Sequence, residues 1–374
     1  MEEKKTNYEF KILYVLGMLL VISGHYGSGL MSFRQLFPYD TFHIPLFVFA
    51  SGYFFKIRTV SNKSELFAFL RRKFRRLVIP YYLWMAVYLV VGYLLNKYTI
   101  MDIQGGITSF VSFFTEPILY GHGAEYNVSS WFLLTLFFVE ACYAAFRYFC
   151  RAVSLTDEYL ILMILLLLAV AAQLLSAAET VYSMKRILVQ IGYLMFWYDV
   201  GYVYHSKWEA ITRRRKNWQV LIPVIAAAFL LRMFYDPGKD VISVIFSARF
   251  YPNIPYVFFR TALGITFWLR VSFILTPWLK NCRPVLYFAD HTFSLLMHQG
   301  MAGLVINTVI RHFFPARIED SLFTTQIWYH LNTSRHIWTV IYVLLIPVMI
   351  LVPVFLYDRV KNRIKGKNRE AVSG

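Results

Sequence analysis

The sequence predicts an all-α integral membrane protein with about ten transmembrane helices and both termini in the cytoplasm. Three observations predict it. Of the 374 residues, 58% are hydrophobic and only 16% are charged, against about 25% charged in soluble proteins. The apolar residues gather in runs of about 20, the length that a helix needs to cross a bilayer. The formal net charge of +17 is concentrated between particular runs, as in membrane proteins oriented by their basic loops.

The same composition excludes a soluble enzyme, a disordered tail and a disulfide scaffold. A soluble basic protein would place its cations on a nucleic-acid face, but this chain lacks the polar surface to stay dissolved, so membrane lipid is expected as partner and nucleic acid is not. The three cysteines form no CxxC pair and no metal-binding spacing, so no metal is expected. The chain also contains no Walker loop, Rossmann fingerprint, GxSxG elbow or HExxH motif.

Ten stretches are predicted to span the membrane: residues 11–30, 42–57, 77–95, 128–147, 158–175, 188–204, 218–235, 255–278, 286–310 and 337–357. The first has no small-residue cleavage site and is followed by further apolar spans, so it is expected to be a span and not a cleaved signal peptide. Neither a repeat nor a long linker divides the chain. Residues 1–374 are therefore predicted to form one transmembrane domain, with 359–374 as a basic cytoplasmic tail.

The distribution of Lys and Arg tests this topology. With the N-terminus inside and the spans alternating, 26 of these residues fall inside, nine fall outside, and three lie within or at the ends of spans. An excess of cations on the cytoplasmic side is the expected bias. It supports an even number of spans.

Two of the predicted outside loops, residues 96–127 and 311–336, are long and carry aromatic, Gly and His residues. Long connections often have a function of their own, and aromatic rings beside polar groups suit the faces of sugars. Amphipathic segments lying at the membrane interface would have the same composition. The two interpretations are equally supported; the side chains concerned are Tyr120, His122, Tyr126, Trp328 and His330.

His25, near the outer end of the first span, is the candidate catalytic residue. It follows Lys11 by 14 residues, about 21 Å along a helix. An ionisable side chain at that depth is costly unless it faces protein or water, and a neutral imidazole is the usual general base. A His buried against a neighbouring helix is the alternative. Helical spacing predicts one shared face for Lys11, Tyr14, Met18, Val21 and His25.

A basic run at residues 71–76 precedes the third span on the predicted cytoplasmic side. Within a helix, Arg72 would share a face with Arg75, and Lys73 with Arg76. The planar guanidinium of Arg grips phosphate oxygens in two places, so the run is a candidate phosphate site. Its alternative role is to anchor the topology or to contact anionic lipid.

Three further spans carry polar residues. The second contains His43 and Ser51-Gly52, which predicts close helix packing or an approach of substrate to the backbone. Trp131, at the outer start of the fourth, is expected to anchor the interface or to stack on a sugar. In the ninth, His298 shares a face with His291 and Ser294, which predicts that this face meets a cavity or a partner helix.

Two carboxyl groups, those of Glu140 and Asp199, are predicted inside the membrane. They are expected either to pair with a cation or to belong to a proton path. The expected cation partners are Arg232, Arg260 and Arg270.

Taken in order, these motifs resemble the membrane-bound acyltransferase family three, which includes O-acetyltransferases of bacterial surface polysaccharides. Each motif is weak alone, but five in this order on a ten-span chain are fairly specific, and they cover nearly the whole chain. The motifs are Ser23-Gly24-His25; Pro45-Leu46-Phe47 with Ser51-Gly52-Tyr53; Arg72 to Arg75 with Ile79-Pro80-Tyr81; Trp131-Phe132-Leu133; and Thr292 to His298.

The resemblance implies an O-acetyltransferase of the bacterial cytoplasmic membrane. It would move an acetyl or similar acyl group from cytoplasmic acetyl-CoA to a hydroxyl of a cell-surface or lipid-linked glycan. The co-substrate is acetyl-CoA, and no metal is implied. The residues that it assigns are His25 to catalysis; Arg72, Arg75, Arg76 and Lys11 to the coenzyme; and His43, Ser51, Gly52, Trp131 and His298 to substrate contacts or structure.

One position departs from the family pattern. The family has Arg or Lys eleven positions before its first-helix His, where this chain has Tyr14. Lys11, one turn nearer the cytoplasm on about the same face, is the candidate replacement; otherwise the activity is altered or lost. Two rivals remain: a polysaccharide exporter of the same architecture, which needs no coenzyme A site, and a non-catalytic membrane sensor or anchor.

Overall fold

The chain folds as a bundle of helices, here in a computed structural model that describes residues 6–26, 33, 36–98, 109–121, 123–176, 184–234, 248, 254–314 and 336–373. Within these ranges no residue lies in a strand. The helices are α1 (Tyr8–His25), α2 (Tyr39–Tyr53), α3 (Lys63–Lys73), α4 (Ile79–Lys97), α5 (Phe110–Leu119), α6 (Trp131–Ala152), α7 (Glu158–Ser176), α8 (Met184–Val203), α9 (Glu209–Arg214), α10 (Asn217–Phe234), α11 (Ile254–Leu279), α12 (Arg283–Asp290), α13 (Thr292–Phe313) and α15 (His336–Ser373).

Nine of the ten predicted spans overlap one α-helix each, and the ninth, residues 286–310, covers both α12 and α13, which are separated at His291. Eight helices in the described ranges are long and apolar enough to cross a membrane, which confirms the fold class. The two spans outside this set are α2, with only 15 residues, and α8, which carries Lys185, Arg186 and Asp199. Most residues of both helices are buried by other helices, so protein and not lipid surrounds them. The count of ten and the cytoplasmic termini stay predictions.

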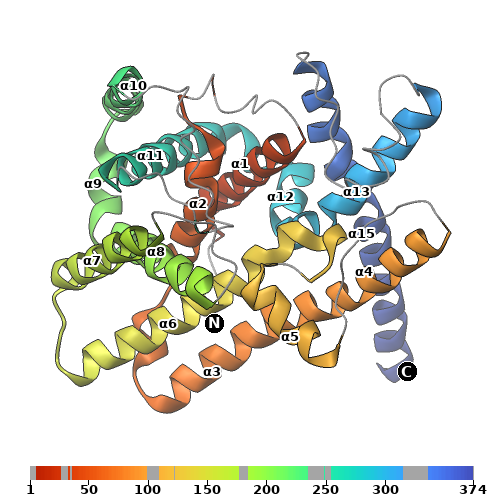
Figure 1. Ribbon diagram of the computed structural model, residues 1–374, viewed down its shortest axis with the longest axis horizontal. Helices are drawn as coiled ribbons and strands as arrows, with labels where there is room; N and C mark the ends of the chain where they lie inside the picture. Colours follow the sequence, from red (N-terminus) through yellow and green to blue (C-terminus); the bar gives the residue numbers. More distant parts are fainter. Residues whose placement is uncertain are drawn as a thin grey trace.

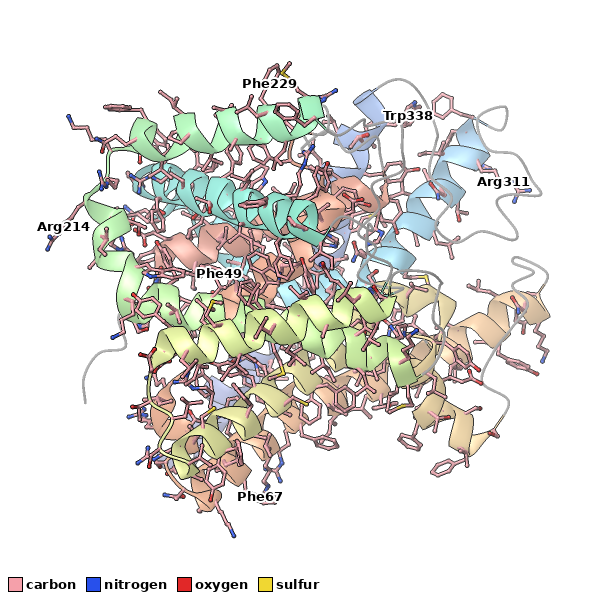
Figure 2. The ribbon with its side chains drawn as sticks, turned by 60° about the vertical axis from the view of Figure 1, so that its left-hand side comes forward. Phe49, Phe67, Arg214, Phe229, Arg311 and Trp338 are labelled. Carbon is pink, nitrogen blue, oxygen red and sulfur yellow. The ribbon has the colours of Figure 1, made fainter. Side chains whose placement is uncertain are left out.

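The helices are arranged with α1 and α2 in the middle of the bundle (Figure 1). The helices α10 and α11 lie on one side of this pair, and α3, α4 and α6 on the other. Arg214 and Arg311, which the topology places on opposite sides of the membrane, lie at opposite ends of the bundle (Figure 2).

The buried apolar residues form two clusters. One is built largely from α2, α6, α8 and α11, and the other from α4, α13 and α15. Helix α1 belongs to both, because Phe10 and Leu20 face the first cluster while Met18 and Ile22 face the second. This central helix therefore lies where the two halves of the core meet.

Close contact between α2 and α8 depends on glycine. A Cβ atom on Gly52 would lie 1.8 Å from the carbonyl oxygen of Tyr198, and one on Gly201 would lie 2.0 Å from that of Phe49. Backbone meets backbone at both points, so no side chain can move aside. The sequence allowed Ser51-Gly52 to serve either close helix packing or an approach of substrate to the backbone. Gly52 serves close packing between α2 and α8.

We expect Gly52→Ala to destabilise the fold. Forcing a methyl group against a backbone costs on the order of 1–3 kcal/mol or more, so the melting temperature of the purified protein in detergent should fall clearly. Gly192→Ala is the matched control, because its Cβ would come no closer than 3.0 Å to the Ala172 side chain and 3.7 Å to the nearest backbone atom, the Leu168 oxygen. Equal melting temperatures for the two variants would contradict the packing role of Gly52.

Candidate active site

A cavity of about 1710 Å³ lies in the middle of the bundle. Its walls come from the central pair α1 and α2 and from α3, α6 and α13. The five side chains predicted to share one face of α1 all line it: Lys11, Tyr14, Met18, Val21 and His25. That prediction is confirmed. Since Lys11 and His25 are separated by about 21 Å along the helix, the cavity extends through most of the bundle.

The end near Lys11 is basic. Arg72 and Arg76 line the cavity there, together with Lys73 and Arg58. The Lys11 ammonium lies 2.8 Å from the Asp290 carboxylate. Within the described ranges Arg72 and Arg76 form no ion pair with a carboxylate. Two guanidinium groups are thus available to an anionic ligand.

The basic run continues from α3 into a π-helical turn, η3 (Phe74–Val78), which joins α3 to α4. Arg72, Lys73 and Arg76 line the cavity, whereas Arg75 does not. Residues three and four positions apart share a face of a helix, so the predicted shared face of Lys73 and Arg76 is confirmed, and Arg72 shares the cavity with Arg76 and not with Arg75. A phosphate contact by Arg75 stays a prediction.

The other end of the cavity holds two imidazoles. His25 is the last residue of α1, and His43 lies on α2, close enough to interact with it electrostatically. The Nδ1 atom of His43 lies 2.6 Å from the backbone oxygen of Tyr39. A carbonyl only accepts hydrogen bonds, so Nδ1 carries the proton and Nε2 is left as an acceptor. Gly24 lets this wall close, since a Cβ there would lie 2.1 Å from the Tyr39 ring.

Polar and aromatic residues complete this end. Tyr39, Asp40, Ser129 and Trp131 line the cavity there. Trp131, the first residue of α6, is only 8% exposed and lines the cavity. Its ring therefore faces inward, whereas an interface anchor would face the membrane surface. A flat aromatic wall beside hydrogen-bonding groups suits a sugar ring.

Ser51 also lines the cavity, from α2, whereas His298 does not belong to it. The hydroxyl group of Tyr88 lies 2.6 Å from Nδ1 of His298, and the Trp84 ring packs against the imidazole at 4.4 Å. His298 therefore holds α13 against α4, which is the partner-helix interpretation of its polar stripe. Of the loop residues singled out in the sequence, His122, Trp328, His330 and the Tyr126 side chain lie outside the described residues.

The two carboxyl groups predicted inside the membrane do have cation partners, but different ones from those expected. Glu140 lies 2.5 Å from the Lys73 ammonium. Asp199 accepts a hydrogen bond from Tyr143 at 2.7 Å and lies 3.7 Å from Arg147. The expected partners Arg232, Arg260 and Arg270 were wrong, because the pairing depends on helix neighbours that no sequence spacing reveals.

Several lining residues were not singled out as site residues in the sequence, among them Arg58, Asp40 and Tyr198. Tyr14 lies within electrostatic range of Glu140 and Arg76, so the position where the family has a cation is next to cations from another helix. The only sequence signal for Lys73 was its place in the basic run. Within the described residues, no group of three His, Cys, Asp or Glu could hold a metal ion.

A hydrogen-bond network fixes the start of α1 next to the basic end. The Tyr53 hydroxyl donates to Glu209 at 2.9 Å and accepts from Asn7 at 3.2 Å. Arg213 bonds to both Glu209 and Glu9. Burial by itself would raise the pKa of the Glu209 carboxyl, but hydrogen bonds from Arg213, His205 and Tyr53 outweigh it and hold the pKa below its usual value. The carboxylate therefore stays charged, and the network stays formed at neutral pH.

Comparison with known proteins agrees with this geometry. The family model described as an acyltransferase domain, that of acyltransferase family 3, matches residues 7–358. No curated protein and no solved structure matches the chain. A match over nearly the whole chain includes both ends of the cavity and every helix that lines it. The chain is thus an integral membrane acyltransferase and belongs to acyltransferase family 3.

Proposed function

We propose that this acyltransferase is an O-acetyltransferase of the bacterial cytoplasmic membrane. It moves an acetyl or similar acyl group from cytoplasmic acyl-CoA to a hydroxyl of a cell-surface or lipid-linked glycan. The single observation that carries the proposal is the continuous cavity, which joins two arginines that form no ion pair with any described carboxylate to an imidazole pair about 21 Å away. Coenzyme A has the matching form: phosphates at one end, a thin flexible arm, and a thioester at the other end.

Each part of the donor has a counterpart along the cavity. Arg72 and Arg76 suit the phosphates, since guanidinium groups bind phosphate oxygens in bidentate fashion. The arm would pass Tyr14 and Phe47, whose rings stack at 6.1 Å. The thioester would then lie beside His25 and His43. The positive-inside bias supports a donor that enters from the cytoplasm.

The transfer requires one proton acceptor. His25 takes the proton of the acceptor hydroxyl as its oxygen attacks the thioester carbonyl carbon. The new C–O ester bond forms, the C–S bond breaks, and the coenzyme A thiolate leaves. Protonated His25 then returns the proton to the thiolate, so the products are an ester and free coenzyme A. Lipid and protein around the site exclude bulk water, which limits hydrolysis of the thioester.

Mass spectrometry of the glycans tests the acyl group and the acceptor together. We expect surface or lipid-linked glycans from cells with the intact gene to carry one acetyl mass per modified sugar, and glycans from cells without the gene to lack it. A different mass difference would identify another acyl group. Identical glycans from both strains would contradict the proposal.

The rival with an observation in its favour is export of a polysaccharide, because a long cavity through a bundle also suits a conduit. Export predicts a loss of surface glycan with no change in its acetylation. It also predicts no binding of coenzyme A, since a conduit has no use for the phosphate site. The same comparison of strains therefore separates the two functions.

A further inference from the structure

The cavity contains a carboxylate that the proposed chemistry does not use. Glu140 lies on α6 and lines the cavity between the basic end and the imidazole end. Its side chain is only 1% exposed. One carboxylate oxygen, Oε1, lies 2.5 Å from the Lys73 ammonium. The other, Oε2, is buried and accepts no hydrogen bond from any described residue.

A buried carboxylate oxygen without a donor is unfavourable, because it has lost water and gained no partner. Cores therefore rarely keep such an oxygen without a reason. The ion pair with Lys73 explains why the carboxylate stays charged, but it engages only one of its two oxygens. Oε2 itself has almost no exposed surface, but Glu140 is a lining residue, so a small shift of its side chain would bring Oε2 to a donor on an occupant of the cavity.

The depth of Glu140 limits which donor that is. Glu140 comes nine residues after Trp131, about 13 Å along α6 from the imidazole end. It lies within electrostatic range of Tyr14, which is one turn from Lys11 on α1. Oε2 of Glu140 thus lies far from the imidazole end, where the thioester is placed, and close to the basic end. In a coenzyme A molecule placed along the cavity, that depth holds the pantoyl half of the arm, with its amide N–H and hydroxyl O–H.

We propose that Oε2 of Glu140 binds the arm of the acyl donor by accepting a hydrogen bond from the pantoyl amide or hydroxyl. This inference rests on the proposed function. Glu140 is here a binding residue for the donor and not a catalytic residue, because it lies far from the reacting carbonyl. Lys73 holds the carboxylate ionised and aligned. Through this pair the basic run fixes the arm as well as the phosphates.

Equilibrium binding to the purified full-length protein tests the assignment without knowledge of the acceptor. The two probes are coenzyme A and adenosine 3′,5′-bisphosphate, which keeps the nucleotide but lacks the arm. We expect Glu140→Gln to weaken binding of coenzyme A by about tenfold, the usual effect of losing a hydrogen bond to a charged group. Binding of the bisphosphate should be unchanged or tighter, because Lys73 is left without its counter-charge.

Arg72→Ala is the matched comparison, since it should weaken both probes. Unchanged binding of coenzyme A to Glu140→Gln would overturn the assignment, and so would equal weakening of both probes. The first outcome favours a proton path through Glu140, and the second a structural role. If the glutamine variant does not fold, Glu140→Asp serves instead, because its shorter carboxylate keeps the charge but withdraws from the cavity; the same selective loss is expected. Failure of the wild-type protein to bind either probe would instead contradict the proposed function.

Discussion

Replacement of His25 by alanine is expected to lower acyl transfer by about 10²–10⁴-fold, the usual contribution of a general base. The physical reason is that the acceptor hydroxyl keeps its proton and attacks the thioester poorly. Binding of coenzyme A should change little, because Arg72 and Arg76, the proposed phosphate contacts, line the other end of the cavity. The measurement compares acetylation of the cell-surface glycan at equal protein level and binding of coenzyme A to the purified variant.

The matched control for this variant is His312→Ala. His312 lies near the end of α13, is exposed and does not line the cavity. Its loss should leave acetylation unchanged. Full acetylation by the His25 variant would show that His25 is not the base, and His43 would then be the next residue to replace, since its Nε2 is the other acceptor at that end.

The second large effect is expected at the basic end. Replacement of both Arg72 and Arg76 by alanine should raise the KM for acyl-CoA by about 10²-fold or more, because each guanidinium–phosphate contact contributes about 1.5–3 kcal/mol. The turnover number at saturating donor should fall far less, since neither side chain reaches the thioester. Steady-state kinetics with a varied concentration of acyl-CoA separates the two constants.

Two neighbouring arginines make this experiment selective. Arg71→Ala removes an exposed cation of the same run that does not line the cavity, so its KM should stay within about twofold of wild type. Arg75→Ala tests the other arginine that helical spacing places on the face of Arg72. Since Arg75 does not line the cavity, its KM should also stay close to wild type. A large effect of Arg75 with a small effect of Arg76 would contradict the cavity as the donor site.

Much of the site was predictable because it depends on one helix. The spacing of Lys11, Tyr14, Met18, Val21 and His25 along α1 is regular, so a shared face follows from 3.6 residues per turn. The structure places all five on the cavity. Prediction was weaker for the basic run. Helical spacing lets Arg72 share a face with either Arg75 or Arg76, and only the structure places Arg76, and not Arg75, on the cavity.

Pairings between helices were not predictable. The sequence showed that Glu140 and Asp199 lie in apolar stretches and need partners, but it offered three wrong arginines. The actual partners, Lys73 and Arg147, come from α3 and α6. The role of His298 was likewise open until Tyr88 and Trp84 were found around it. In each case a polar group in an apolar surrounding takes whichever partner the packing brings near, and sequence distance says nothing of that.

The sequence by itself determined that this is a helical membrane protein and which family its motifs resemble. These properties follow from composition and from residue order along single helices, because lipid selects apolar runs one helix at a time. Only the tertiary structure decided that the basic run and His25 share one cavity, that Arg76 lines it while Arg75 does not, and that Glu140 lines it beside Lys73. The reason is that a cavity is enclosed by several helices at once, and its chemistry is set by which of their faces meet.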